Sequence, residues 1–147
     1  MSAKLCSKEE LLNLLKVFIS LKSVDSEPIA KKECLDWIET AFLGEKIKDI
    51  QRGDFDGSPW IYLPAGGCKL LVFAHCDVVP APDEMFDLVV DGDTAKGRGT
   101  SDMKGNILPF LMAYRDAVKE GTEPPVSILI TTDEEVAGNT IPHLIDT

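Results

Sequence analysis

The 147-residue chain contains no apolar run near the ~20 residues that a membrane-spanning helix needs, so no such helix is predicted. Basic residues are also scarce, because 15 lysines and arginines face 25 acidic residues and leave a formal net charge of −10. This balance argues against nucleic acids and anionic membranes as partners. An acidic, solvated surface explains most of the excess, and part of it could belong to a site that cations neutralise. Repeats and low-complexity segments are absent from the sequence, which fits one domain with its own core.

Cysteines are few and widely spaced. Cys6, Cys34, Cys68 and Cys76 form no CxxC pair, so we expect free thiols in a reducing, cytoplasmic compartment. The first four residues lead into a capped helix and not into a signal peptide, which agrees with that expectation.

Helical and strand patterns alternate along the chain. Helices are expected at 7–21, 28–44, 105–120 and 140–145, and strands at 47–52, 60–63, 69–74 and 126–132. Residues 80–93 are expected to form a long loop. Pro109 is expected near the first turn of the third helix, where a proline costs least. This alternation predicts an α/β fold, with a mostly parallel sheet flanked by helices.

Acidic residues follow the most apolar of these strands. Val126–Thr132 leads directly into Asp133-Glu134-Glu135, and adjacent carboxylates at a strand end predict a positive partner in the crevice there. Two other segments end alike, 70–74 at His75-Cys76-Asp77 and 97–101 at Asp102. One histidine with several carboxylates is the ligand set of a divalent-metal hydrolase.

Each motif taken alone also has a simpler interpretation. On a strand, His75 and Asp77 share a face while Cys76 points away, so Asp77 could orient a metal-bound His75, or the two could form a surface hydrogen bond. Asp102 could bridge two metals or cap the following helix. Of Glu134 and Glu135, one could bind metal while the other works as a general base, or both could lie in an exposed acidic turn.

Together the three motifs resemble the signature blocks of the M20 metallopeptidase family. The blocks are Ala74–Pro80, Gly97–Gly105 and Thr132–Gly138, in the family order, with 27 residues from His75 to Asp102 and 32 from Asp102 to Glu134. The family includes acetylornithine deacetylase, succinyl-diaminopimelate desuccinylase, aminoacylase-1 and glutamate carboxypeptidase. The resemblance, with the two N-terminal helices, covers nearly the whole chain.

The resemblance implies a role for each matched residue. His75 resembles the ligand of the first metal, Asp102 the bridging ligand and Glu135 the ligand of the second metal. Asp77 resembles the carboxylate that orients His75, and Glu134 resembles the general base. Two zinc ions per complete site are implied, with cobalt or manganese as substitutes. A cis peptide bond after Asp102 is implied as well.

The same resemblance implies that residues 1–147 are the N-terminal segment of an incomplete zinc-peptidase-like catalytic domain. The family has one further ligand for each metal, and a dimerisation or lid domain, beyond the part that matches here; His143 does not match the missing histidine. The complete enzyme is expected to be a homodimer that cleaves the amide bond of N-acyl amino acids or small peptides. A desuccinylase or acetylornithine deacetylase is favoured, and the segment alone is expected to be inactive. The alternative is a non-catalytic, truncated α/β module that binds a partner.

Overall fold

The computed structural model describes residues 6–46 and 48–146. Four α-helices are present among them: α1 (Lys8–Ser20), α2 (Pro28–Phe42), α3 (Lys104–Lys119) and α4 (Thr140–Asp146). Six strands accompany them: β1 (Gln51–Phe55), β2 (Ser58–Leu63), β3 (Leu70–His75), β4 (Val89–Asp91), β5 (Thr94–Lys96) and β6 (Val126–Thr131). Three short 3-10 helices complete the elements: η1 (Gly44–Lys46), η2 (Asp83–Phe86) and η3 (Glu134–Val136).

The main sheet has the strand order β1-β2-β6-β3, so that the buried strand β6 lies inside it. Strands β3 and β6 pair in parallel, whereas β1 with β2 and β2 with β6 are antiparallel. The α/β class is therefore confirmed, and the sheet is mixed. Strands β1 and β2 are antiparallel because Asp56 and Gly57, both with positive φ, turn the chain between them in a two-residue hairpin.

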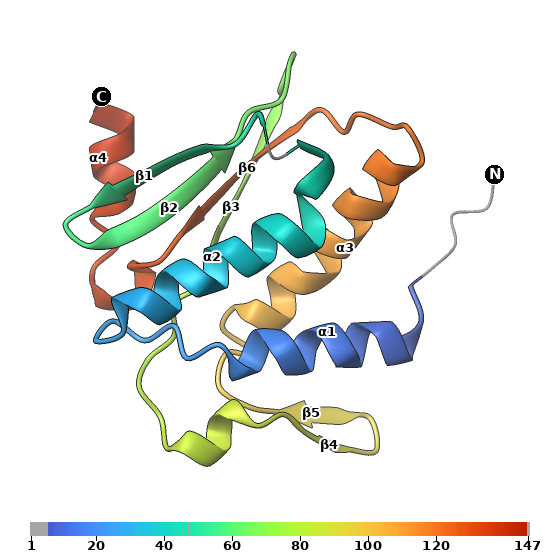
Figure 1. Ribbon diagram of the computed structural model, residues 1–147, viewed down its shortest axis with the longest axis vertical. Helices are drawn as coiled ribbons and strands as arrows, with labels where there is room; N and C mark the ends of the chain where they lie inside the picture. Colours follow the sequence, from blue (N-terminus) through green and yellow to red (C-terminus); the bar gives the residue numbers. More distant parts are fainter. Residues whose placement is uncertain (1–5, 47, 147) are drawn as a thin grey trace.

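Helices α1, α2 and α3 lie together on one side of the main sheet, whereas α4 lies beside β1, away from these three helices (Figure 1). The predicted N-cap of α1 is present, because Ser7 Oγ accepts a hydrogen bond from the Glu10 N–H at 3.1 Å. The apolar faces of the three helices meet the sheet in one core, whose fully buried members include Phe18, Ile19, Ile38, Leu108, Leu111, Ile128 and Ile130.

Three expectations about local structure were wrong in detail. The first strand begins at Gln51 and not at 47, because η1 and a turn at 48–49 precede it; position 47 lies outside the described residues. The expected loop at 80–93 contains η2 and the first strand of the small β4–β5 hairpin. Gly92, with φ of 58°, allows the tight turn of that hairpin. Pro109 lies inside α3, beyond its first turn.

Strand β3 is one of the two edge strands of the main sheet. Its side chains Leu70, Leu71 and Phe73 are 56%, 51% and 43% exposed, whereas the last two residues of the strand are buried. The apolar sequence of this strand is therefore not matched by burial along its first half. None of the helices in the described ranges is long and apolar enough to cross a bilayer.

Candidate metal centre

The parallel pairing of β3 with β6 brings two of the predicted motifs to one edge of the sheet. His75 is in register with Thr131, and the Cys76 N–H donates to the Thr131 carbonyl oxygen at 3.0 Å, which extends the pairing past the last ladder residue. Because both strands run in the same direction, the residues that follow them emerge side by side. Asp77 and the Glu134–Glu135 turn therefore become neighbours.

Asp102 reaches the same place from a tight loop before α3. The Gly105 N–H donates to the Gly99 carbonyl oxygen at 3.0 Å, and this hydrogen bond closes the loop. Gly105 cannot be replaced without movement, since a Cβ there would lie 2.1 Å from the Thr100 carbonyl oxygen. The Asp102–Met103 peptide bond is cis, as the family resemblance implies.

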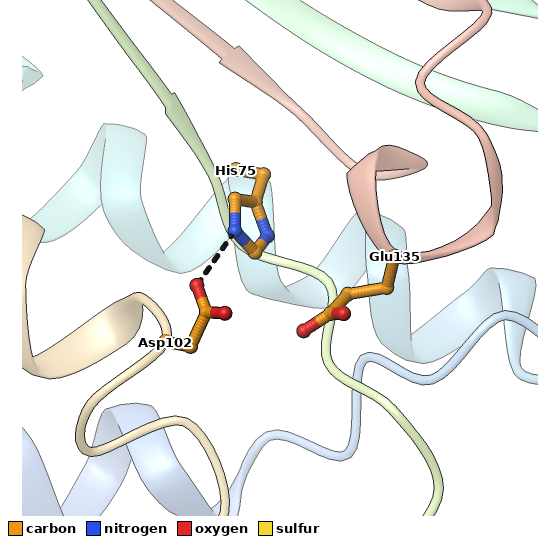
Figure 2. Close-up of side chains that lie close together, drawn as sticks. All are labelled: His75, Asp102 and Glu135. Atoms are coloured by element: carbon orange, nitrogen blue, oxygen red, sulfur yellow. Dashed lines mark hydrogen bonds and ion pairs between the residues drawn. The ribbon is translucent and has the colours of Figure 1, made fainter.

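His75, Asp102 and Glu135 converge as predicted. One ligand atom from each lies within 4.8 Å of the others. Figure 2 shows the three side chains entering a common space from the end of β3, from the loop before α3 and from the turn after β6. The three residues are far apart in sequence, so the fold and not local spacing brings them together.

The imidazole of His75 is held between carboxylates on both of its nitrogens. On one side, Nδ1 lies 3.2 Å from the Asp77 carbonyl oxygen and 3.3 Å from Asp77 Oδ1. On the other, Nε2 lies 3.2 Å from Asp102 Oδ1 and 3.6 Å from Glu134 Oε2. His75 and Asp77 are both buried, so the interpretation of this pair as a surface hydrogen bond is wrong.

Of the two other simple interpretations, the helix cap at Asp102 is wrong, whereas the exposed acidic turn at Glu134 and Glu135 is partly correct. Asp102 does not cap α3, because the N-cap position is Met103 and no side chain caps the helix there. The side chain of Asp102 is 73% exposed and turns instead toward His75. The side chain of Glu134 is also partly exposed, at 48%, so the acidic turn after β6 faces solvent. The same side chain nevertheless lies close to His75.

The charges of the cluster shift the pKa values of its members. Burial on its own lowers the pKa of His75, but Asp77, Glu134 and Asp102 outweigh burial and raise it to about 9. Burial also disfavours ionised Asp77, yet the His75 contact and the Glu135 N–H leave the pKa of Asp77 below its usual value. Burial, followed by the charge of Asp102, raises the pKa of Glu135, as expected for one carboxylate of a crowded cluster.

Several supporting residues were missed by sequence reasoning. Ser23, to which the sequence assigns no role, is fully buried, and its Oγ donates to the Cys76 carbonyl oxygen at 2.6 Å. Its carbonyl oxygen accepts from the Val78 N–H at 3.1 Å, so Ser23 fixes the backbone on either side of Asp77. Asp133 Oδ2 accepts from the Thr140 N–H at 2.8 Å and thereby links the two ends of the glutamate turn. An isolated serine gives no sequence signal, and the motif that contains Asp133 does not predict its bond to Thr140.

His143 lies away from this cluster. It is on α4, and its ring stacks on that of Phe55 in β1 with 4.2 Å between centroids. This location agrees with the expectation that His143 does not match a metal ligand of the family.

The residues that converge are suited to a divalent metal. An imidazole nitrogen and two carboxylates are the ligand types that zinc accepts, and the separation of up to 4.8 Å allows ligand atoms around one ion or an adjacent pair. The buried Asp77 Oδ1 makes no hydrogen bond of good geometry, although it lies beside His75 Nδ1. An Nδ1–H directed at this side of the ring leaves Nε2 available as the ligand atom.

Comparison with known proteins agrees with this geometry. The sequence profile of Peptidase family M20/M25/M40 matches residues 71–147, which include all of the converging residues. The chain belongs to this family. The recognition of M20 blocks in the sequence is therefore confirmed, and so is membership of a family of hydrolytic enzymes.

Relatives of the family extend the likeness over most of the chain. It is 29% identical to a probable carboxypeptidase of Ajellomyces dermatitidis over 97% of its length, and 36% identical to a succinyl-diaminopimelate desuccinylase of Ruthia magnifica over 82%. These matches cover 36% and 35% of the two relatives, so the chain spans about a third of their length. The crystal structure of human carnosine dipeptidase 1 has the same fold, with a TM-score of 0.67 and 19% identity over 93% of this chain and 34% of that one.

Proposed function

We propose that this chain is the N-terminal segment of the catalytic domain of a metal-dependent amide hydrolase. The observation that carries the proposal is the convergence of His75, Asp102 and Glu135 within 4.8 Å, on three separate segments. His75 and Asp102 would hold one zinc ion, and Asp102 and Glu135 a second, with Asp102 between them. Cobalt or manganese are the expected substitutes.

Bound zinc would supply Lewis acidity toward a water molecule and a carbonyl group. The residues of this chain have the remaining tasks. Glu134, whose side chain is about half exposed and near His75, would accept a proton from the attacking water and deliver it to the leaving amine. Asp77 would hold the His75 ring in place with Nε2 toward the metal, and through its other oxygen would fix the backbone of Glu135.

Three ligands shared between two ions are too few for a stable catalytic site, since a catalytic zinc usually has three protein ligands. The chain spans about a third of the length of its relatives. We therefore attribute the missing ligands to a second half of the catalytic domain, together with a dimerisation or lid domain and a homodimeric complete enzyme. On this view the segment of residues 1–147 is inactive alone.

N-acyl amino acids or small peptides are the proposed substrates, with a succinyl-diaminopimelate desuccinylase or acetylornithine deacetylase favoured. The desuccinylase of Ruthia magnifica, at 36% identity, supports the first of these, and the probable carboxypeptidase supports peptides as the alternative. A small acyl amino acid requires neither nucleic acid nor membrane, which agrees with the acidic charge of the chain. The cysteines described are free thiols, which supports a reducing compartment such as the cytoplasm.

The test combines metal binding with turnover. Zinc binding to this chain is measured by competition with a chromogenic chelator, with Asp102→Asn and Glu135→Gln as site variants and Asp93→Asn, an exposed residue of the β4–β5 turn, as the control. Only the site variants should lose zinc. The open reading frame with any continuation is then assayed on N-succinyl-diaminopimelate, N-acetylornithine and dipeptides. Equal zinc binding by wild type and both site variants would overturn the metal centre, and turnover by residues 1–147 alone would overturn the incomplete-site proposal.

A further inference from the structure

Lys104 is the most completely buried cation near the candidate metal centre. It is the first residue of α3, and its side chain has no exposed surface. Its Nζ donates to the Leu21 carbonyl oxygen at 2.6 Å and to the Phe18 carbonyl oxygen at 3.1 Å, and lies 5.3 Å from the centre of the Phe18 ring. A buried ammonium is costly unless such partners compensate it, so this arrangement has to serve a purpose in the fold.

The partners of Lys104 lie at the C-terminal end of α1. Helix carbonyl groups lack partners there, and the helix dipole favours a positive charge. Helix α1 has no basic residue in its own last turn, so Lys104 supplies that charge from a distant part of the sequence. The contact joins the start of α3 firmly to the end of α1.

The side chain of Lys104 also packs against the loop that carries Asp102. Its Cδ and Cγ atoms would lie 3.2 and 3.4 Å from a Cβ at Gly99, so the lysine stem packs against the loop where it begins. The Gly105 N–H closes the loop onto Gly99, and Asn106 Nδ2 donates to the Ser101 carbonyl oxygen at 2.6 Å. Apart from its contact with His75, the Asp102 side chain makes no hydrogen bond to the part of the chain that the structure describes.

We infer that Lys104 is a positioning residue, whose bond to the end of α1 holds the 99–105 loop so that Asp102 faces His75. Asp102 is mostly exposed and has no other side-chain support, so the backbone of its loop sets its position. Because the ammonium fixes that backbone two residues away, loss of the ammonium would let Asp102 move while the sheet that carries His75 stays intact. The inference rests on the proposed metal centre, and it adds to that centre a residue that would not itself contact the metal.

Lys31 provides a matched control. It is also a buried lysine, 1% exposed, and its Nζ contacts Asp25 Oδ1 at 3.0 Å and Ser58 Oγ at 3.2 Å. It lies on α2, and none of its hydrogen-bond partners belongs to the 99–105 loop. Lys31→Met therefore removes a buried ammonium without touching the support of Asp102.

The experiment compares Lys104→Met, Lys104→Arg and Lys31→Met in the chain of residues 1–147. Zinc affinity is measured by chelator competition, and thermal unfolding in EDTA reports the stability of each variant. Lys104→Met should bind zinc at least tenfold more weakly, a loss typical of residues that orient ligands. Lys104→Arg, which keeps the charge, should recover part of the affinity. Lys31→Met should lower stability and leave the affinity within about twofold, since it does not reach the ligands.

A second measurement needs no metal. The chain has two histidines, so the ring signals of His75 can be assigned by NMR with His143→Gln as reference. In EDTA at fixed pH, Lys104→Met should move the His75 ring signals in the same direction as Asp102→Ala, whereas Lys31→Met should not. If wild type binds no zinc, the metal centre fails and these ring signals alone decide the role of Lys104.

Two results would overturn the inference. One is a folded Lys104→Met variant with wild-type zinc affinity and unchanged His75 ring signals. The other is an equal loss of affinity in Lys31→Met, which would reduce both lysines to general stabilisers. If Lys104→Met does not fold, Lys104→Gln, which also removes the charge, is measured against the same two criteria. Wild-type zinc affinity together with unchanged His75 ring signals in that variant would overturn the inference too.

Discussion

The carboxylate of Asp77 accepts a hydrogen bond from the backbone N–H of Glu135, with 2.9 Å between Oδ2 and the nitrogen. The other oxygen of the same carboxylate lies 3.3 Å from His75 Nδ1. One buried acid therefore contacts the segments that deliver two of the three candidate ligands. Asp77 sets the distance between these segments as well as the orientation of the histidine ring.

Replacing Asp77 should therefore weaken metal binding more than a change of surface charge would. Asp77→Asn keeps an acceptor for the Glu135 N–H but removes the charge beside His75. We expect a loss of zinc affinity of about 10- to 100-fold, the range typical of residues that orient ligands. Chelator competition measures it, and Asp93→Asn, fully exposed and paired only with Lys8, is the control. An affinity within twofold of wild type would show that Asp77 does not orient the ligand.

Glu134 and Glu135 are predicted to separate catalysis from metal binding. In the complete enzyme, Glu134→Gln should lower turnover by about 10²- to 10⁴-fold, because the amide keeps the shape of the side chain but cannot accept a proton. Its metal content should stay near that of wild type. Glu135→Gln should lose metal as well as activity. Metal analysis of both purified variants checks this, and loss of metal in Glu134→Gln would mean that the two roles are exchanged.

The metal-free chain should become less stable as the pH rises from 6.5 to 9. His75 has a pKa of about 9 in the fold, against 6.5 for an unperturbed histidine. Its contribution to stability is complete below pH 6.5, where both states are protonated, and is lost as the folded state also loses its proton near pH 9. Urea unfolding in EDTA at pH 6, 7.5 and 9 measures the trend. His75→Gln should flatten it, and an equal slope in that variant would assign the trend to other groups.

Repulsion among the crowded carboxylates should lower the stability of the metal-free chain. The pKa of Glu135 is raised, first by burial and then by Asp102, so its charged form is disfavoured in the fold at neutral pH. Glu135→Gln should therefore raise the melting temperature in EDTA at pH 7, while the stabilisation of wild type by added zinc disappears. Thermal unfolding with and without zinc tests both parts. A lower melting temperature in EDTA would contradict the repulsion.

The edge strand β3 should promote self-association of this chain. Leu71 and Phe73 are about half exposed, and the exposed half of the strand, residues 70–73, has neither proline nor charge to protect its edge. Phe73→Lys should reduce association in sedimentation velocity runs at increasing concentration. Val17→Lys, on the surface of α1 and nearly as exposed as Phe73, should not reduce it. Monomeric wild type at all concentrations would disprove the prediction.

Much of this molecule could be predicted from local sequence. The cap at Ser7, the apolar face of α1 and the buried strand β6 follow from residue type and periodicity, and each is where the pattern indicates. The β4–β5 hairpin was not predicted, because its strands are three residues long and mostly exposed and therefore show no alternation of buried and exposed residues.

In the candidate site, too, some residues could be predicted from sequence and others could not. The three motifs identify His75, Asp102 and Glu135 by residue type and order, and the structure brings them together. Ser23 and Lys104 could not be found from sequence, because each acts through backbone carbonyl groups of distant segments. A carbonyl group is present at every position, so nothing in the sequence marks which one receives such a bond.

The register of His75 with Thr131 also determines when the centre can form. Strands β3 and β6, which carry these residues, are neighbours in space but are separated in the chain by β4, β5 and the whole of α3. A large loop must therefore close before they pair. During synthesis, a ribosome that has released His75 and Asp102 still holds the strand that delivers Glu135. The nascent chain therefore has no complete cluster to bind a cation until the last strand of the sheet has emerged. If the proposed metal centre binds zinc, binding would follow folding of the sheet, and bound zinc would report that the sheet is complete.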